Sequence, residues 1–204
     1  MDDRVGELRR ADLDPDPLVQ FRRWYAEAGA AGVRAPEAMA LATSTSDGAP
    51  SLRMVLLKGA DERGFAFYTG YVSRKASELD SNPRAALLFY WDPLGRQVRI
   101  EGTVERVAEN ESDAYFATRP RGAQLAATAS KQSSVLANRD EIDSRVAELD
   151  HDYTAREVPR PEHWGGYRLV PDIYEFWQHR EDRLHDRLRY RRADGSWAIE
   201  RLSP

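Results

Sequence analysis

Basic and hydrogen-bonding side chains gather in a few short stretches of this sequence. They are Arg53 and Lys58 in SLRMVLLKG, Ser73, Arg74 and Lys75 in VSRK, Arg96 and Gln97 in GRQ, Arg119 and Arg121 in TRPRG, Gln132, Ser133 and Ser134 in SKQSS, and Arg183, His185 and Arg187 in DRLHDRLRY. Phosphate oxygens accept several charge-assisted hydrogen bonds at once, so cations beside hydroxyls and free backbone N–H groups suit a phosphate. VSRK offers such a set where a helix is expected to start. Each stretch alone is more often solvated surface.

Spacing relates some of these residues to one another. Arg183, His185 and Arg187 occupy every second position, and a β-strand points alternate side chains to one face. We therefore predict one strand face that presents all three. Arg53 and Lys58 are five apart, so a regular strand places them on opposite faces. One ligand shared by both requires a bulge or a strand end between them.

Other chemistries lack their motifs. The four histidines, at 151, 163, 179 and 185, show no HExxH or paired ligand spacing, so we expect no metal site. GxSxG, P-loop and GxGxxG motifs are absent from the sequence. The chain has no cysteine, which excludes disulfides and thiolate nucleophiles. Its net charge of -4 argues against binding to duplex nucleic acid.

Length and composition favour one well-buried domain over residues 1–204, with residues 1–15 as a flexible segment. Hydrophobic residues make up 41% of the 204 residues and charged residues 31%. No apolar run approaches 18 residues, and the N-terminus MDDRVGELRRADLDPDP is polar throughout. We therefore expect a cytoplasmic protein.

The elements that must position the basic residues are mostly strands. The spacing of Leu18, Phe21 and Tyr25 predicts a helix near 16–30, capped by Asp16. Eight strands are expected, in AMALATS, SLRMVLLKGA, FAFYTG, RAALLFYWDP, RQVRIEGTVERVA, YRLVPDIYEFWQH, DRLRYRR and SWAIERL. Two further helices start at Asn110 and at Asn138, the latter with Glu141 as in a capping box. This pattern predicts a mainly β (α+β) barrel with helical insertions.

Ordered blocks across the chain carry a family resemblance. From about residue 8 to the end they read LRRADLDPDPL, RMVLLK, FYTGYVSRK, GRQVRIEG, YFATRPRGAQ, SKQSS, WGGYRL, EFWQ, RLHDRLRY and ERLSP. In this set the chain resembles the pyridoxine (pyridoxamine) 5′-phosphate oxidases. The resemblance implies a homodimeric FMN-binding split β-barrel, with two FMN sites at the subunit interface.

The resemblance also implies roles for individual residues. Those expected to bind FMN are Arg53, Met54, Val55, Leu56, Leu57, Lys58, Tyr68, Thr69, Arg74, Lys75, Gln97, Gln132, Ser133, Trp177 and Arg187, with Trp177 and Arg187 coming from the partner subunit. Those expected to bind substrate are Lys58, Tyr115, Arg119, Arg183, Leu184 and His185. Among them, Arg183 and His185 are the expected catalytic residues.

The implied reaction oxidises pyridoxine 5′-phosphate or pyridoxamine 5′-phosphate to pyridoxal 5′-phosphate. A hydride passes from C4′ of the substrate to N5 of FMN, and O2 reoxidises the flavin to give H2O2. With the amine substrate, water then releases NH3.

Several positions depart from the family pattern. The N-terminus has no Arg-Arg-Glu-Tyr-like run, Ala123 stands where a Ser is usual, and His179-Arg180 replaces a Gly-Gly pair. Two alternatives therefore stay open. One is a phenazine-biosynthesis FMN oxidase of the same fold, and the other is a non-catalytic flavin- or nucleic-acid-binding barrel.

Overall fold

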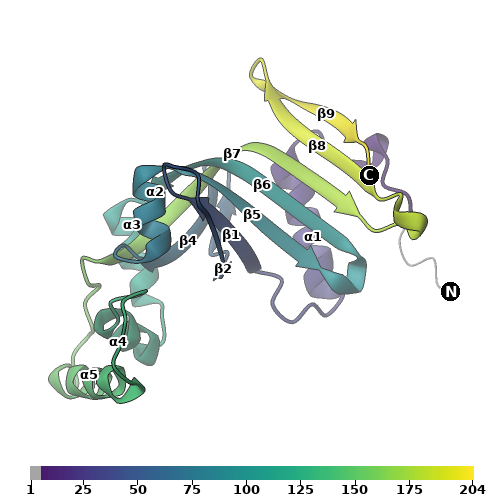
Figure 1. The fold of residues 1–204 in the computed structure, drawn as a ribbon. Coiled ribbons are helices and arrows are strands. Elements are labelled where there is room, and N and C mark those ends of the chain that lie inside the picture. The colour runs from purple at the N-terminus through teal and green to yellow at the C-terminus, as the bar shows by residue number, and fades with distance from the viewer. Residues whose placement is uncertain (1–5) are drawn as a thin grey trace.

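The computed structural model describes residues 6–204 and consists mainly of one curved antiparallel sheet (Figure 1). Its strands are β1 (Ala38–Ser44), β2 (Pro50–Leu56), β3 (Gly59–Asp61), β4 (Gly64–Gly70), β5 (Arg84–Trp91), β6 (Arg96–Arg106), β7 (Trp164–Gln178), β8 (Asp186–Ala193) and β9 (Ser196–Leu202). The α-helices are α1 (Pro17–Ala30), α2 (Arg74–Ser81), α3 (Glu109–Ala117), α4 (Arg121–Ala129) and α5 (Arg139–Asp152). Short 3-10 turns are η1 (Arg10–Asp12), η2 (Asp92–Leu94) and η3 (Glu181–Arg183).

The long strand β7 joins two parts of the sheet. The strand order is β2-β1-β5-β6-β7-β4-β3, and β8 and β9 continue from β7. Residues 164–169 of β7 pair with β4, whereas residues 173–178 pair with β8. Between these halves the register with β6 shifts at Glu101/Gly102, and a Cβ on Gly102 would lie 2.0 Å from the Val170 carbonyl oxygen. The bulge therefore requires glycine and bends the sheet into a split half-barrel.

Helix α1 covers the inner face of this sheet. As predicted, the Asp16 side chain caps the helix and accepts a hydrogen bond of 2.8 Å from the Leu18 N–H; Pro17 occupies the first turn. Phe21 and Trp24 are buried completely, and the Phe21 ring contacts Phe65 edge to face at 4.9 Å. This aromatic packing favours burial of the strand residues that face α1.

The expected elements are largely present. SLRMVLLKGA forms two strands, β2 and β3, rather than one. Asn138 accepts from the Glu141 N–H at 3.1 Å and begins α5 as predicted. The predicted cap at Asn110 is wrong, because α3 already begins at Glu109. Helix α4 was not predicted, since the Pro and Arg residues before it lack a capping signal.

The segment before α1 is attached to the C-terminal hairpin. The Leu8 N–H donates to the Asp186 carboxylate at 3.0 Å, and the Arg201 guanidinium donates to the Leu8 carbonyl at 2.7 Å. Leu8 and Leu13 are buried. The rest of the segment expected to be flexible, residues 1–5, lies outside the described residues.

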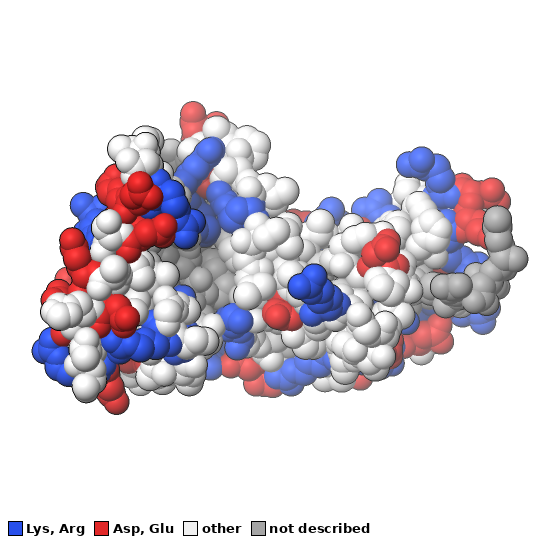
Figure 2. All heavy atoms as spheres, turned by 90° about the horizontal axis from the view of Figure 1, so that it is seen from below, with Lys and Arg blue, Asp and Glu red and all other residues white. Residues whose placement is uncertain are grey.

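Charge is distributed unevenly over the surface. Figure 2 shows acidic and basic side chains intermingled at the end formed by α4 and α5, with a broad, mostly uncharged stretch beside them.

Over residues 6–204, no helix has the length and apolar character needed to cross a membrane.

Candidate functional site

A cavity of about 750 Å³ lies between β2, the end of β4, α2 and the segments around α4. Its lining residues are Ser51, Leu52, Arg53, Met54, Val55, Leu56, Lys58, Tyr68, Thr69, Arg74, Lys75, Tyr115, Arg119, Pro120, Gln132, Ser133 and Trp164. Five of these are Lys or Arg and none is Asp or Glu, although the whole chain carries a net charge of -4. The cavity is therefore suited to an anionic ligand.

Strand β2 forms one wall along its free edge. The strand pairs with β1 on one side only, and residues from both of its faces, such as Arg53 and Met54, line the cavity. Backbone N–H and C=O groups of this edge consequently face the cavity beside the side chains. The strand ends at Leu56, which meets the condition for Arg53 and Lys58 to share one ligand, although SLRMVLLKGA was predicted as a single strand. Leu57, by contrast, points into the hydrophobic core and does not line the cavity.

Glu78 of α2 fixes two of the cations. Its carboxylate pairs with Arg53 at 3.2 Å and with Arg74 at 2.8 Å, and it accepts from Ser51 and Thr43 at 2.5 Å each. Burial acts to raise the pKa of Glu78, but the hydrogen bonds from Ser51, Thr43, Arg74 and Arg53 outweigh burial and lower the pKa to about 2. Glu78 is thus ionised and holds both guanidinium groups at the cavity wall.

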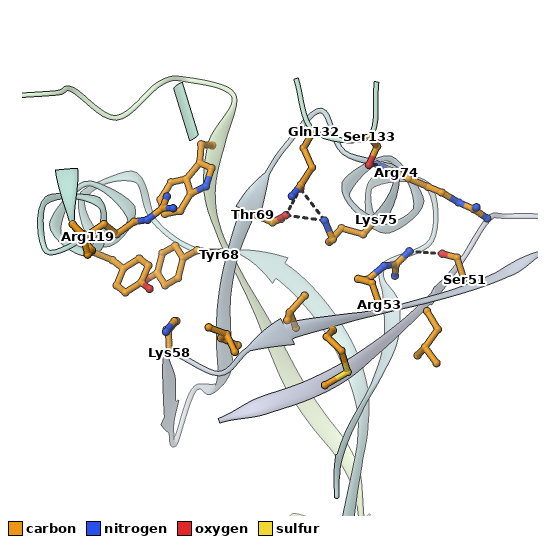
Figure 3. A pocket seen from close by; sticks show the side chains of 17 residues that line it. Ser51, Arg53, Lys58, Tyr68, Thr69, Arg74, Lys75, Arg119, Gln132 and Ser133 are labelled. Atoms are coloured by element: carbon orange, nitrogen blue, oxygen red, sulfur yellow. Dashed lines mark hydrogen bonds between the residues drawn. The ribbon is translucent and has the colours of Figure 1, made fainter. Parts of the chain in front are cut away.

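Lys75 is buried at the same end of the cavity (Figure 3). Its ammonium donates to Thr69 Oγ1 at 2.9 Å, to Gln132 Oε1 at 2.8 Å and to Ser73 Oγ at 3.3 Å. Burial, and then the positive charge of Arg53, lower the pKa of Lys75 to about 8. Within residues 6–204, no carboxylate lies within ion-pairing distance of this ammonium. A bound anion would supply the missing counter-charge.

Aromatic rings and Arg119 form the opposite side of the cavity (Figure 3). Tyr68 stacks on Tyr115 with ring centroids 4.0 Å apart, and Trp164 lies nearly parallel to Tyr115. The Arg119 guanidinium lies over the Trp164 ring at 4.5 Å, and burial lowers the pKa of Arg119. Among the described residues no acceptor satisfies the buried Arg119 Nη1. An oxygen ligand in the cavity could accept from this group.

Two residues that hold the cations of the cavity, Trp164 and Glu78, were not predicted from sequence, and neither were the lining residues Ser51, Leu52 and Pro120. Trp164 was not among the predicted site residues, yet it supports Arg119 and lines the cavity. Glu78 was not singled out at all. Its position four residues after Arg74 on a predicted helix was the available signal.

A second set of predicted residues lies outside this cavity, on the outer face of the sheet. Strand register places Gln97 opposite Trp177 and Trp177 opposite Arg187, so the three side chains form one row across β6, β7 and β8. Arg187 is held by Glu175, at 2.8 Å from its Nε. We call this set the outer row.

The prediction that Arg183, His185 and Arg187 share one strand face is wrong. Only Arg187 lies in a strand, because β8 begins at Asp186, whereas Arg183 ends the turn η3. Asp182 and Arg183 have φ values of 53° and 61°, which no extended strand contains. Leu184 is exposed, and the His185 ring packs against Trp177 at 4.6 Å. We call residues 179–185 the β7–β8 loop; it adjoins the outer row.

No group of three or more His, Asp or Glu side chains within residues 6–204 is placed to hold a metal ion.

Comparison with known proteins gives two matches to family models. Residues 26–151 match the family described as pyridoxamine 5'-phosphate oxidase, and residues 164–204 match the pyridoxine 5'-phosphate oxidase C-terminal dimerisation region. The first match alone spans more than half of the chain.

Relatives match over nearly their full length. A pyridoxine/pyridoxamine 5'-phosphate oxidase of Rubrobacter xylanophilus is 60% identical over 98% of this chain and 92% of its own, and one of Nostoc sp. is 50% identical over the whole of both chains. Among solved structures, PhzG from Burkholderia lata, in complex with tetrahydrophenazine-1-carboxylic acid, has a TM-score of 0.92 at 38% identity over 98% of this chain and 99% of its own. An FMN-binding protein of Nostoc punctiforme shares the fold, with a TM-score of 0.74 at 17% identity over 94% of this chain and all of its own. The chain belongs to the pyridoxamine 5′-phosphate oxidase family.

Proposed function

We propose that this protein is an FMN-dependent oxidase that converts pyridoxine 5′-phosphate or pyridoxamine 5′-phosphate to pyridoxal 5′-phosphate, with O2 as the electron acceptor. The observation that carries this proposal is one cavity with cations at both ends and no carboxylate in its lining. Two phosphorylated ring compounds, cofactor and substrate, match that charge distribution.

The FMN phosphate fits the end formed by Arg53, Arg74 and Lys75. Lys75 is buried among neutral acceptors, so the cost of its charge falls when a dianion binds beside it. Thr69, Gln132 and Ser133 surround the same position and can bind along the ribityl chain. The free edge of β2, from Arg53 to Leu56, offers backbone groups to the ring system, while Tyr68 lines the cavity on the side of Tyr115.

The substrate phosphate fits the end formed by Lys58, Tyr115 and Arg119. Arg119 Nη1, which has no acceptor among the described residues, can donate a hydrogen bond to a phosphate oxygen. The Trp164 ring packs against the Arg119 guanidinium and orients it. A carboxylate in the same role would compete with the substrate phosphate for this cation.

A second copy of the chain completes the site. Residues 164–204 match a dimerisation region, and β2 exposes Leu52, Met54 and Leu56, which also line the cavity. Burial of such side chains stabilises a homodimer. We assign the outer row (Gln97, Trp177, Arg187) to the partner's flavin, and we assign Arg183, Leu184 and His185 to the partner's substrate.

In this arrangement the protein orients the reactants and excludes water. When bound, FMN supplies the ring that accepts the hydride from substrate C4′ and is reoxidised by O2 to yield H2O2. Arg183 would lie beside the substrate ring and restrict its orientation, and His185 can donate a hydrogen bond to it. For the amine substrate, water then hydrolyses the imine and releases NH3.

An oxidase acting on a phenazine precursor is the second candidate. It is favoured by the 0.92 TM-score of this chain to PhzG. A carboxylate carries one negative charge, whereas Lys58 and Arg119 together present two positive charges and Tyr115 adds a hydroxyl donor. This set fits a phosphate dianion better.

The two candidates differ in what bleaches the flavin. The purified protein is expected to be yellow and to lose its flavin absorbance when pyridoxine 5′-phosphate is added without oxygen. Bleaching by a dihydrophenazine carboxylic acid alone would support the second candidate. A colourless protein that takes up no FMN would contradict both.

A further inference from the structure

The β7–β8 loop contains an imidazole that the proposed reaction does not use. His179 lies directly after β7, and its ring centroid is 5.2 Å from that of His185. Trp177 contacts both rings, at 6.1 Å from His179 and 4.6 Å from His185. The three rings form one cluster at the end of the outer row.

The backbone of the neighbouring turn fixes His179. Its N–H donates to the Gly95 carbonyl at 2.8 Å. Gly95 has a φ of 55°, and a Cβ at this position would lie 2.8 Å from the His179 Cβ. Gln178 also donates to the carbonyls of Leu94 and Gly95, at 3.2 Å each. His179 is therefore anchored to the β5–β6 turn, independently of the 3-10 turn that carries Arg183.

His185 is held in one tautomer. The Arg180 backbone N–H lies 3.2 Å from His185 Nδ1. A backbone N–H can only donate, so Nδ1 acts as the acceptor and the ring proton resides on Nε2. Protonation of Nδ1 would turn this hydrogen bond into a contact between two donors.

We propose that His179 is a positioning residue for His185, which it keeps in the neutral form with Nε2–H available to the substrate. This inference rests on the proposed function, in which His185 contacts the substrate of the partner's cavity. His179 acts by packing against the ring and by disfavouring a second positive charge next to it.

The charged groups around His185 agree with this role. Burial first, and then the proximity of His179 and Arg183, lower the pKa of His185. The adjacent Asp186 is engaged by Arg201 at 2.6 Å and by the Leu8 N–H at 3.0 Å, and Arg180 lies 3.9 Å from it. Across residues 6–204, no ion pair joins Glu181 or Asp182 of the turn to either imidazole. The loop thus offers His185 cationic neighbours and no carboxylate partner.

The test is an NMR titration of the histidine rings in the flavin-loaded protein. The chain has only four histidines, so each signal can be assigned by substitution. In His179→Asn, the His185 titration is expected to move to higher pH, because a repelling group has been removed. The acid limb of the pH profile of kcat/KM should move in the same direction, while the thermal midpoint stays near that of the wild type.

Two further variants keep the proposal falsifiable. His179→Phe retains an aromatic ring that cannot take up a proton and is expected to shift His185 as Asn does. His151→Asn, on exposed α5, should leave both profiles unchanged. An unchanged His185 titration in either His179 variant overturns the proposal. Failure of the wild type to oxidise pyridoxine 5′-phosphate would instead overturn the proposed function, because the titration needs no substrate.

Discussion

The cavity and the outer row differ in how completely one chain builds them. At the cavity, Lys75 and Glu78 are 8% and 3% exposed, and each makes several hydrogen bonds within the same chain. The outer row, together with the β7–β8 loop, lies on an open face, with Leu184 exposed to 68%. The comparison indicates that a single chain preorganises the anion-binding half of the site, and in the proposed dimer the other half meets its ligand only across the subunit interface.

Mixing subunits gives the sharpest test of this division. Lys75→Met should remove the anion-binding half, and Arg183→Ala should remove the catalytic half, so each homodimer is expected to be nearly inactive. When the two variants are unfolded and refolded together, half of the dimers are expected to contain one subunit of each variant. In such a dimer both changes fall on one site, and the other site is intact. About one quarter of wild-type activity should return in a turnover assay.

If the subunits are shown to have exchanged and no activity returns, the anion-binding half and the catalytic half of each site must come from the same chain. That result would contradict the proposed contribution of the outer row to the partner's site.

Lys75→Met should also weaken FMN binding by about 100-fold, because a charge-assisted hydrogen bond to a buried phosphate contributes about 3 kcal/mol. Quenching of FMN fluorescence measures the affinity. Lys131→Met, which removes a nearby exposed lysine, is the matched control and should change affinity little. Equal losses in the two variants would mean that general positive charge, and not the buried ammonium, binds the phosphate.

The pKa of about 8 at Lys75 predicts a pH dependence for the same affinity. Below pH 8 the ammonium is already charged in the free protein, so affinity should not depend on this group. Above pH 8 binding must first take up a proton, and the affinity should fall by up to about tenfold per pH unit. If the FMN affinity of Lys75→Met also falls above pH 8, a group other than Lys75 is responsible for the pH dependence.

Substitution of Trp164 should have the smallest effect. Trp164→Leu removes the ring under Arg119 and is expected to raise KM for pyridoxine 5′-phosphate about fivefold, with kcat nearly unchanged, because a cation–π contact contributes about 1 kcal/mol. Trp164→Phe keeps an aromatic face and should recover most of the loss. A lower kcat with unchanged KM would contradict a role in substrate binding.

Local sequence patterns predicted the parts of the site that depend on neighbours in the chain. The helix start at VSRK is an example, whereas SLRMVLLKGA was predicted as one strand and the end of β2 at Leu56 was not predicted. The period-two spacing of Arg183, His185 and Arg187 misled, because it cannot reveal the positive φ angles that end the strand. Trp164 was placed by packing between segments that lie far apart in sequence, which no single-sequence period records.

The continuity of β7 has a consequence for communication within the dimer. Its first residue, Trp164, lines the chain's own cavity, and Trp177 near its end is assigned to the partner's. In the proposed dimer, one hydrogen-bonded strand, about 43 Å long from Trp164 to Trp177, therefore runs from one active centre to the other. A change at one centre could therefore reach the other along a single strand, past the register shift at which Gly102 of β6 pairs with Pro171 of β7.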